Sequence, residues 1–309
     1  MISMRQHAIS LIAVFLALTL GLFLGSGFIG DRVNSMTGAD RDRLGKLEDQ
    51  RDSLTEQVNQ NNSFISAISG RVTDGLLDKR SVLVVTSPNA ADGDVQALKG
   101  LINDAGGTFA GQIGLTTSLV RDENASKLAS IIDQSIPPGQ QLRVDYTDSG
   151  SRTGDLLGVV LLHRDGAKPV ADADRDNALE ALRAGGFIDY TGATLKPADL
   201  VLVVTGGGLP KDSGAQGQLV GRLAAAMSQR GQGGVLTGRK GSADGSASIA
   251  TVRADPQLGN SVSTVDDVDV EMGRLTAVMA LNEETKGRSG AFGTGPGATA
   301  ITVGAEPVR

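Results

Sequence analysis

The side chains with the most reactive chemistry are few in this chain and lie far apart in sequence. Among the 309 residues there is no cysteine, which excludes disulfides, thiolate metal sites and cysteine nucleophiles. His163 is the only histidine beyond the amino-terminal segment. A catalytic triad or a zinc site needs more partners than one imidazole, and neither G-x-S-x-G nor H-E-x-x-H occurs. We therefore expect His163 to be structural, and we predict no catalytic residue and no enzyme.

Methionine sulfur is the remaining soft donor, of the kind that copper(I) prefers. Met272 and Met279 are seven residues apart on a predicted helix and so share a face. That spacing is equally typical of core packing, which we favour. Met36 and Met227 are far from this pair in sequence, and no M-x-x-M or H-x-H cluster occurs. The residues therefore identify no metal ligands, and we expect no cofactor.

Two glycine-containing stretches resemble phosphate-binding loops without completing them. Residues 206–208 are three glycines after a predicted strand, but the third glycine position of the dinucleotide fingerprint is not met. In GGVLTGRK, residues 233–240, Arg239 and Lys240 replace the Lys and Ser/Thr that a P-loop requires. We interpret the first stretch as a flexible turn and the second as a short strand.

An acidic stretch imitates the first half of a calcium loop. Asp172, Asp174 and Asp176 have the right spacing, but Asn177 and Arg183 stand where the loop requires Gly and a bidentate Glu. Carboxylates are also favoured in the first turn of a helix, where they meet its positive end. We therefore predict a helix amino terminus.

The overall composition argues against nucleic-acid binding. The net charge is −6, and aromatic residues make up only 3 % of the chain. Such a chain lacks both electrostatic attraction to phosphates and stacking platforms for bases.

An uncharged stretch near the amino terminus predicts a membrane anchor. Residues 8–29 contain no charged side chain, and as a helix they would span roughly 33 Å, enough for a bilayer core of about 30 Å. The run is longer than a secretory h-region, and no A-x-A site follows, although cleavage near Gly25 to Gly27 is the alternative. We predict an uncleaved anchor at residues 1–30. Arg5 precedes it, which places the amino terminus in the cytoplasm and the bulk of the chain outside.

Gly21 and Gly25 form a G-x-x-x-G pair within this stretch, a spacing that lets two membrane helices approach closely. The alternative is that glycine is simply common in membrane helices. We include both glycines among the predicted dimerisation residues.

Residues 31–78 predict a coiled-coil stalk. With Leu44 at position a, apolar residues recur at heptad positions a and d over more than four heptads. Arg51 at a and Asn61 at d interrupt the seam, and Gly75 is the last d position. The alternative is a single amphipathic helix on the globular part, but we favour a parallel homodimer. Its predicted contacts are Leu44, Leu47, Leu54, Val58, Ile65, Ile68 and Val72.

The remainder predicts an α/β domain at residues 79–287, in which short apolar strands alternate with helices in a mostly parallel sheet covered on both faces. Beyond it, residues 288–309 predict a flexible tail. The predicted strands are 81–90, 107–115, 156–166, 198–208 and 233–239, with a strand or loop at 261–269. The predicted helices are 94–107, 121–136, 172–186, 214–231, 246–253 and 270–287.

Several stretches resemble the actinobacterial MctB/SteB family, which carries the label "copper transporter". They are MISMRQHAISLIAVFLALTLGLFLGSG at the start, the coiled coil, VLVVTSP and LVLVVTGGGLP. The resemblance implies a mycolic-acid-type envelope and a role in copper homeostasis, with copper as the one metal in question. In the SteB branch it implies a membrane partner, SteA, in cell division and envelope assembly. It implies no catalytic residues.

Three functions remain open. The first, which we favour, is a non-catalytic single-pass envelope protein that dimerises through the coiled coil and presents its α/β domain to partners. The second is a component of a copper-exporting channel, supported by the resemblance alone. The third is an enzyme that uses the turn at residues 206–208, which would require nucleotide binding.

Overall fold

The computed structural model describes residues 28–191 and 195–307. They belong to two compact units, divided between Asn61 and Asn62. The first unit contains most of one long helix, and the second contains the end of that helix together with an α/β domain.

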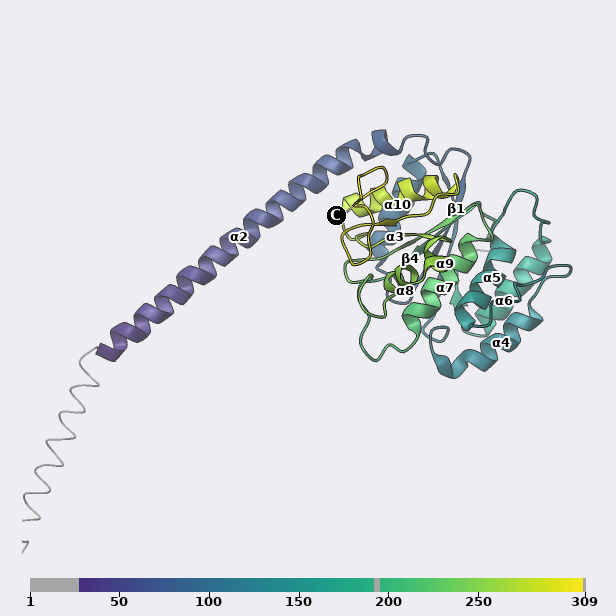
Figure 1. Cartoon of the computed structure of the whole chain (residues 1–309), viewed down its shortest axis with the longest axis horizontal. Helices are drawn as coiled ribbons and strands as arrows, with labels where there is room; N and C mark the ends of the chain where they lie inside the picture. Colours follow the sequence, from purple (N-terminus) through teal and green to yellow (C-terminus); the bar gives the residue numbers. More distant parts are fainter. Residues whose placement is uncertain (1–27, 192–194, 308–309) are drawn as a thin grey trace, which may run out of the picture. The chain divides into compact units, whose positions relative to one another are not determined.

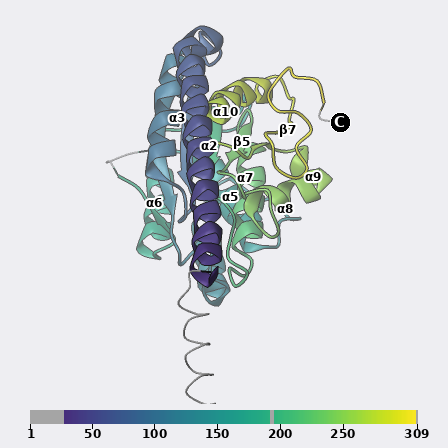
Figure 2. The same ribbon diagram turned by 90° about the vertical axis from the view of Figure 1, so that its left-hand side faces the viewer.

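The long helix is α2, Phe28–Thr73, which is continuous in both views (Figures 1 and 2). Its 46 residues correspond to a length of roughly 69 Å at 1.5 Å per residue. The helix ends at Thr73 because Gly75 adopts the left-handed conformation, with φ 69°, that commonly terminates a helix. The stalk predicted to reach residue 78 is therefore helical only to Thr73, and Gly75, which the heptad pattern assigns to position d, lies beyond the helix.

The α/β domain is built on a seven-stranded sheet of order β3-β2-β1-β4-β5-β6-β7. All neighbouring strands are parallel except β3, which runs antiparallel to β2 at one edge. The strands are β1 (Ser81–Thr86), β2 (Thr108–Leu115), β3 (Ile188–Asp189), β4 (Leu200–Val204), β5 (Gly234–Thr237), β6 (Ser263–Val265) and β7 (Ala291–Phe292). The mostly parallel α/β sheet predicted from the sequence is confirmed.

Helices cover both faces of the sheet (Figure 1). Alternate residues of a strand point to opposite faces: Val82 and Val84 of β1 pack with one core cluster, Leu83 and Val85 with the other. The first cluster includes residues of α3 (Asp92–Asp104) and α10 (Glu271–Glu284). The second face carries α4 (Ala125–Gln134), α5 (Ser149–Leu161), α6 (Asp172–Ala184), α7 (Gln216–Ser228), α8 (Ser248–Ala254) and α9 (Pro256–Gly259).

One predicted strand was wrong: residues 156–161 belong to helix α5. The run LLGVVLL is uniformly apolar because this helix is buried, and a short apolar run cannot distinguish a buried helix from a buried strand. The distinguishing signal lay upstream, in glycines at 150, 154 and 158. A Cβ at Gly154 would lie 2.4 Å from the carbonyl oxygen of Leu223 on α7, so the glycines allow the two helices to approach closely.

Two edge strands, β3 and β7, were not predicted, because each is only two residues long. In the segment predicted as a flexible tail, β7 pairs with β6, and Gly293 N–H donates to the carbonyl of Ala300 at 3.0 Å. The carboxylate of Asp266 accepts hydrogen bonds from the backbone N–H groups of Thr294, at 2.9 Å, and Gly295, at 3.0 Å. These contacts attach the segment to the end of β6.

Candidate functional sites

The first candidate site is the apolar seam of α2. In the first unit, Leu44, Leu47, Leu54 and Val58 are between 50 % and 61 % exposed. A shallow groove along this face is lined by Leu47, Leu54 and Val58 together with Gln50, Arg51 and Thr55. A long helix with an exposed apolar stripe is stable in water when another apolar surface covers the stripe.

In the second unit, the same heptad positions remain accessible at the end of α2. Val72 is 40 % exposed, and Ile65 and Ile68 are half-buried. By contrast, Ser69 at position e and Thr73 at position b are buried, and Thr73 Oγ1 donates to the carbonyl of Ser69 at 2.9 Å. At its domain end, α2 thus buries Ser69 and Thr73 and leaves Ile65, Ile68 and Val72, at positions a and d, at least partly exposed.

Arg51 is the polar residue at position a, and its charge defines a testable feature of the seam. Its guanidinium pairs at 2.7 Å with the neighbouring Asp52, and both side chains are more than two-thirds exposed. A parallel in-register dimer would place two Arg51 side chains face to face, which costs stability through repulsion and desolvation. We expect Arg51→Leu to stabilise such a dimer by about 1–3 kcal/mol in urea unfolding.

Lys46→Leu is the matched control. Lys46 occupies the outward position c, and this variant removes one positive charge, as Arg51→Leu does. It should leave the dimer's free energy of unfolding within about 0.5 kcal/mol of the parent. Equal stabilisation by both variants would show that position 51 does not face a second copy.

The predicted glycine pair Gly21 and Gly25 lies outside the described residues, as do residues 8–27 of the predicted anchor. Within residues 28–191 and 195–307, no helix is both long and apolar enough to span a bilayer.

The second candidate site is the carboxyl edge of the sheet, where the neighbouring strands β1 and β4 end. After β1 the chain continues to β2 on one side of this pair, and after β4 it continues to β5 on the other side. Such a switch point is where open α/β sheets bind ligands. Here Ser87 Oγ is 2.6 Å from Asn89 Oδ1 and 3.1 Å from Thr205 Oγ1. Among the contacts of the described residues, no imidazole or carboxylate approaches these hydroxyls as a base.

The glycine turn at residues 206–208 lies at this edge and is closely packed. A Cβ at Gly206 would lie 2.4 Å from the carbonyl oxygen of Asn89, and one at Gly207 would lie 2.7 Å from that of Lys240. None of the three glycines has a positive φ. Glycine is therefore required at residues 206 and 207 so that neighbouring loops can approach closely. The turn that we predicted as flexible is instead tightly packed.

An ionic cluster joins three elements near the same edge. Asp94, in the first turn of α3, is completely buried and accepts from Arg239 Nε at 2.6 Å and from Arg274 Nη2 at 3.1 Å. The bonded carboxylate of Asp94 raises the pKa of Arg239. Since two guanidinium groups satisfy one buried carboxylate, the cluster is a structural connection between α3, the β5–α8 loop and α10.

Asp267 is the least satisfied polar group of this region. Both of its carboxylate oxygens are buried, and neither has a hydrogen-bond partner among the described residues. Burial, and then the charges of Asp266 and Asp269, raise its pKa from 3.8 to about 6. A carboxylate without a partner is costly to bury, so Asp267 stays protonated to a higher pH in the folded protein than in the unfolded chain.

This pKa predicts a pH dependence of stability. The unfolded carboxyl ionises near pH 4, whereas the folded one stays protonated until about pH 6; stability is therefore lost as pH rises from 4 to 6 and stays lower above. We expect Asp267→Asn to remove this loss and to raise the free energy of unfolding at pH 7 by about 1–3 kcal/mol in urea titrations. Asp165→Asn, at an exposed site, is the control. An unchanged pH profile in Asp267→Asn would refute this assignment.

The remaining residues considered for chemistry do not converge on one site. His163 follows α5, with its side chain 51 % exposed and Nε2 3.9 Å from Asp165. Met227 is fully buried in α7, whereas Met272 and Met279 are half-buried on α10. The acidic stretch opens α6 as predicted, and Asp172 pairs with Arg175 at 2.8 Å.

A metal centre can be tested against these positions. No group of three or more His, Cys, Asp or Glu side chains with metal-binding geometry occurs in the part of the chain that the structure describes. The donors present there do not fit a built copper site of imidazole and carboxylate ligands.

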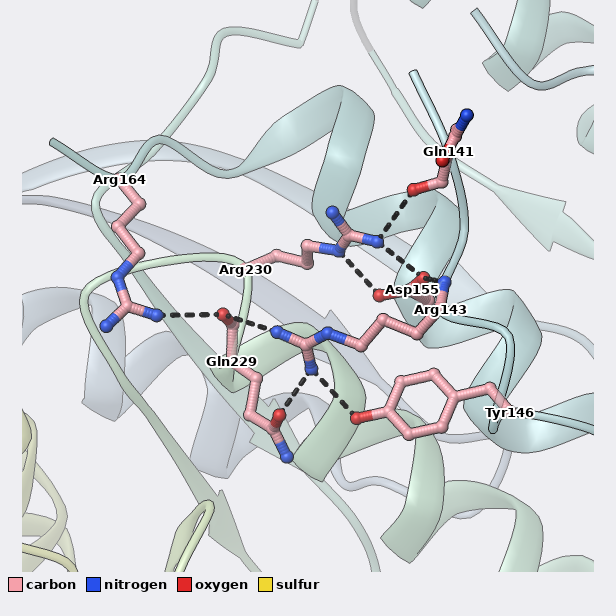
Figure 3. A network of polar contacts seen from close by, with 7 residues as sticks. All are labelled: Gln141, Arg143, Tyr146, Asp155, Arg164, Gln229 and Arg230. Carbon is pink, nitrogen blue, oxygen red and sulfur yellow. Dashed lines mark hydrogen bonds and ion pairs between the residues drawn. The ribbon is translucent and has the colours of Figure 1, made fainter. Parts of the chain in front are cut away.

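The third candidate site is the polar network drawn in Figure 3. It includes Gln229 and Arg230, which lie between the end of α7 and the start of β5, at the opposite, amino edge of the sheet. Asp155 of α5 is completely buried. Its two carboxylate oxygens accept hydrogen bonds from Arg230, one from Nε at 2.6 Å and one from Nη2 at 2.7 Å. It also accepts the backbone N–H of Arg143 at 2.8 Å. The network fixes the loop at residues 135–148, which connects α4 to α5, against the end of α7. Because its members are up to 89 residues apart, spacing in the sequence could not reveal it.

The chain is similar to known proteins over nearly its whole length. The family described as "Copper transport outer membrane protein, MctB" matches residues 1–303. "Copper transporter MctB" of Mycobacterium tuberculosis (strain ATCC 25618 / H37Rv) is 43 % identical over 312 residues, covering 98 % of this chain and 99 % of the relative. "Copper transporter MctB" of Mycobacterium leprae (strain TN) is 44 % identical over 325 residues, with the same two coverages.

Proposed function

Because this chain belongs to the MctB family, we propose that it is a non-catalytic, single-pass envelope protein that acts by binding partners. In this proposal residues 1–30 anchor the chain with its amino terminus in the cytoplasm. The α2 seam forms a parallel homodimer, and the α/β domain outside the membrane presents a surface to envelope or division partners. The observation that carries the proposal is the exposed apolar stripe at heptad spacing on a helix of 46 residues.

The energetic argument for dimerisation rests on the area that the seam would bury. Each exposed Leu, Ile or Val contributes roughly 1.5–3 kcal/mol on full burial. Seven such residues per chain, partly exposed in the single copy, supply on the order of 10 kcal/mol per chain before the cost of association. β-branched residues at a (Val58, Ile65 and Val72) with leucine at d (Leu47 and Leu54) favour two parallel strands.

Copper homeostasis enters this proposal through the relatives, whose names describe copper transporters. We propose that copper homeostasis depends on a partner protein, because the described residues contain no group of three or more His, Cys, Asp or Glu side chains that could hold a metal ion. The resemblance to the SteB branch makes a SteA-like membrane protein the partner to test first.

A copper titration tests whether this chain binds copper directly. We expect residues 31–309 to show no stoichiometric copper binding tighter than about 1 μM, by calorimetry with copper(II) or by competition with a copper(I) chelator. The second candidate function, a component of a copper-exporting channel, is favoured by the relatives' names. Tight stoichiometric binding that is lost in a Met272→Leu/Met279→Leu variant would support it and would contradict an indirect role.

A further inference from the structure

The polar network of Figure 3 contains more positive charge than its own carboxylates balance. Arg230 is neutralised by the bidentate contact with Asp155. Arg143 and Arg164 have no ion pair with any carboxylate in the described part of the chain. Both donate to one acceptor, the backbone carbonyl of Gln229, at 3.2 and 3.4 Å.

The fold accounts for part of this charge. Gln229 caps the carboxyl end of α7, and Arg164 follows the carboxyl end of α5. Each helix end carries about half a negative charge, and cations near it are stabilised. Among the seven residues of Figure 3, two guanidinium groups against two helix ends leave about one positive charge that Asp155 does not balance.

Both arginines also keep unused donors. A guanidinium has five N–H groups. That of Arg143 donates to Tyr146 Oη at 2.9 Å and to both the side chain and the backbone carbonyl of Gln229. The contact with Gln229 is the one hydrogen bond that the Arg164 side chain makes among the described residues. Arginine is suited to planar, bidentate recognition of carboxylates.

A groove of about 680 Å³ lies beside Arg143, on the loop that connects α4 to α5. Polar side chains of Gln140, Gln141 and Tyr146 line it, and Val144 on the same loop is 97 % exposed. The groove is much larger than a phosphate ion, and it combines amide, guanidinium, aromatic and apolar surface. Arginine and aromatic residues around a small apolar centre are typical of protein-binding sites.

We propose that this groove, with Arg143 and Arg164, is the docking site for an acidic peptide segment of a partner protein. The inference rests on the proposed function, because it names the surface and the partner chemistry that the α/β domain would use. The amide side chains suit a peptide backbone, and the two arginines suit Asp or Glu carboxylates. A half-buried guanidinium such as that of Arg143 is recessed from the flat surface of a membrane.

The test uses the full chain in detergent micelles and a fluorescein-labelled hexaglutamate peptide as the probe, read by anisotropy. We expect saturable binding at low salt that weakens with added salt. In the Arg143→Gln/Arg164→Gln variant the affinity should fall at least tenfold. Arg121→Gln/Arg183→Gln removes the same charge from other exposed positions and should change the affinity less than twofold.

Arg164→Gln alone keeps the test decisive if the double variant unfolds, because the Arg164 side chain makes one long hydrogen bond and the loss of that bond should spare the fold. We expect this variant to bind the probe at least threefold more weakly. Equal losses in the control pair would overturn the proposal. The proposal would also be overturned if phosphate competed as well as hexaglutamate, or if phosphatidylglycerol vesicles bound with the same arginine dependence.

The molecular mass of the protein, measured on the same samples, separates this inference from the proposed function. A monomeric parent contradicts the proposed function, whereas a dimer that does not bind the probe contradicts only this inference.

Discussion

Residues 31–309 are expected to sediment as a dimer, and the Val58→Asp/Ile65→Asp variant as a monomer. Both residues occupy position a, at which a second helix would cover them. The variant places four carboxylates in the seam of each dimer, and each buried unpaired charge costs several kcal/mol. This exceeds what the remaining seam residues supply, so dissociation should be complete at micromolar concentration in analytical ultracentrifugation.

The matched control moves the same two charges to the outside of the helix. Gln60 and Ala67 lie two residues after the seam positions, at position c, and both are exposed. Gln60→Asp/Ala67→Asp should leave the mass of the dimer unchanged. A dimer that survives Val58→Asp/Ile65→Asp would show that another surface holds the copies together.

The second large effect is expected at Gly154, where α5 meets α7. A Cβ there would lie 2.4 Å from the carbonyl oxygen of Leu223 and 2.8 Å from its Cα, and backbone atoms cannot move aside independently. We expect Gly154→Val to separate the two helices and to destabilise the domain by about 3–5 kcal/mol. At roughly 2–4 °C per kcal/mol, the melting temperature should fall by about 6–20 °C.

Gly100→Val provides the comparison for that prediction. Gly100 is also inside a helix, α3, but a Cβ added there would have no atom of another element within 4 Å. Valine should change stability there by less than about 0.5 kcal/mol, since its helix propensity is at least that of glycine. Similar melting temperatures for the two variants would contradict the close packing of α5 on α7.

Much of the fold could be predicted because its strands are buried on both faces. Runs such as VLVV in β1 and LVLVV in β4 are uniformly apolar for that reason, and amphipathic helices separate them. The same property misled the interpretation of residues 156–161, since a helix buried between other helices is equally apolar. Its glycines at 150, 154 and 158 were the available signal for helix–helix contact.

The candidate sites were predictable to different degrees. The heptad positions from Leu44 to Val72 follow from local spacing, and α2 places them on one helix. The convergence of Arg143 and Arg164 on Gln229 depends on how α5 and α7 end side by side, which no local pattern encodes. The isolation of Asp267 likewise depends on burial by elements distant in sequence.

Disulfide crosslinking is the most direct test of the central claim, because the chain has no cysteine of its own. A single cysteine at Leu47 or Ile68, in the full chain in its membrane, should form a dimer-sized species under mild oxidation. In a parallel in-register pair each residue meets its own copy within disulfide range, whereas an antiparallel pair separates the two copies by tens of ångströms. Asp49→Cys, on the outward face, should remain monomeric on a non-reducing gel. Equal crosslinking at position 49, or none at 47 and 68, would contradict a parallel dimer through α2.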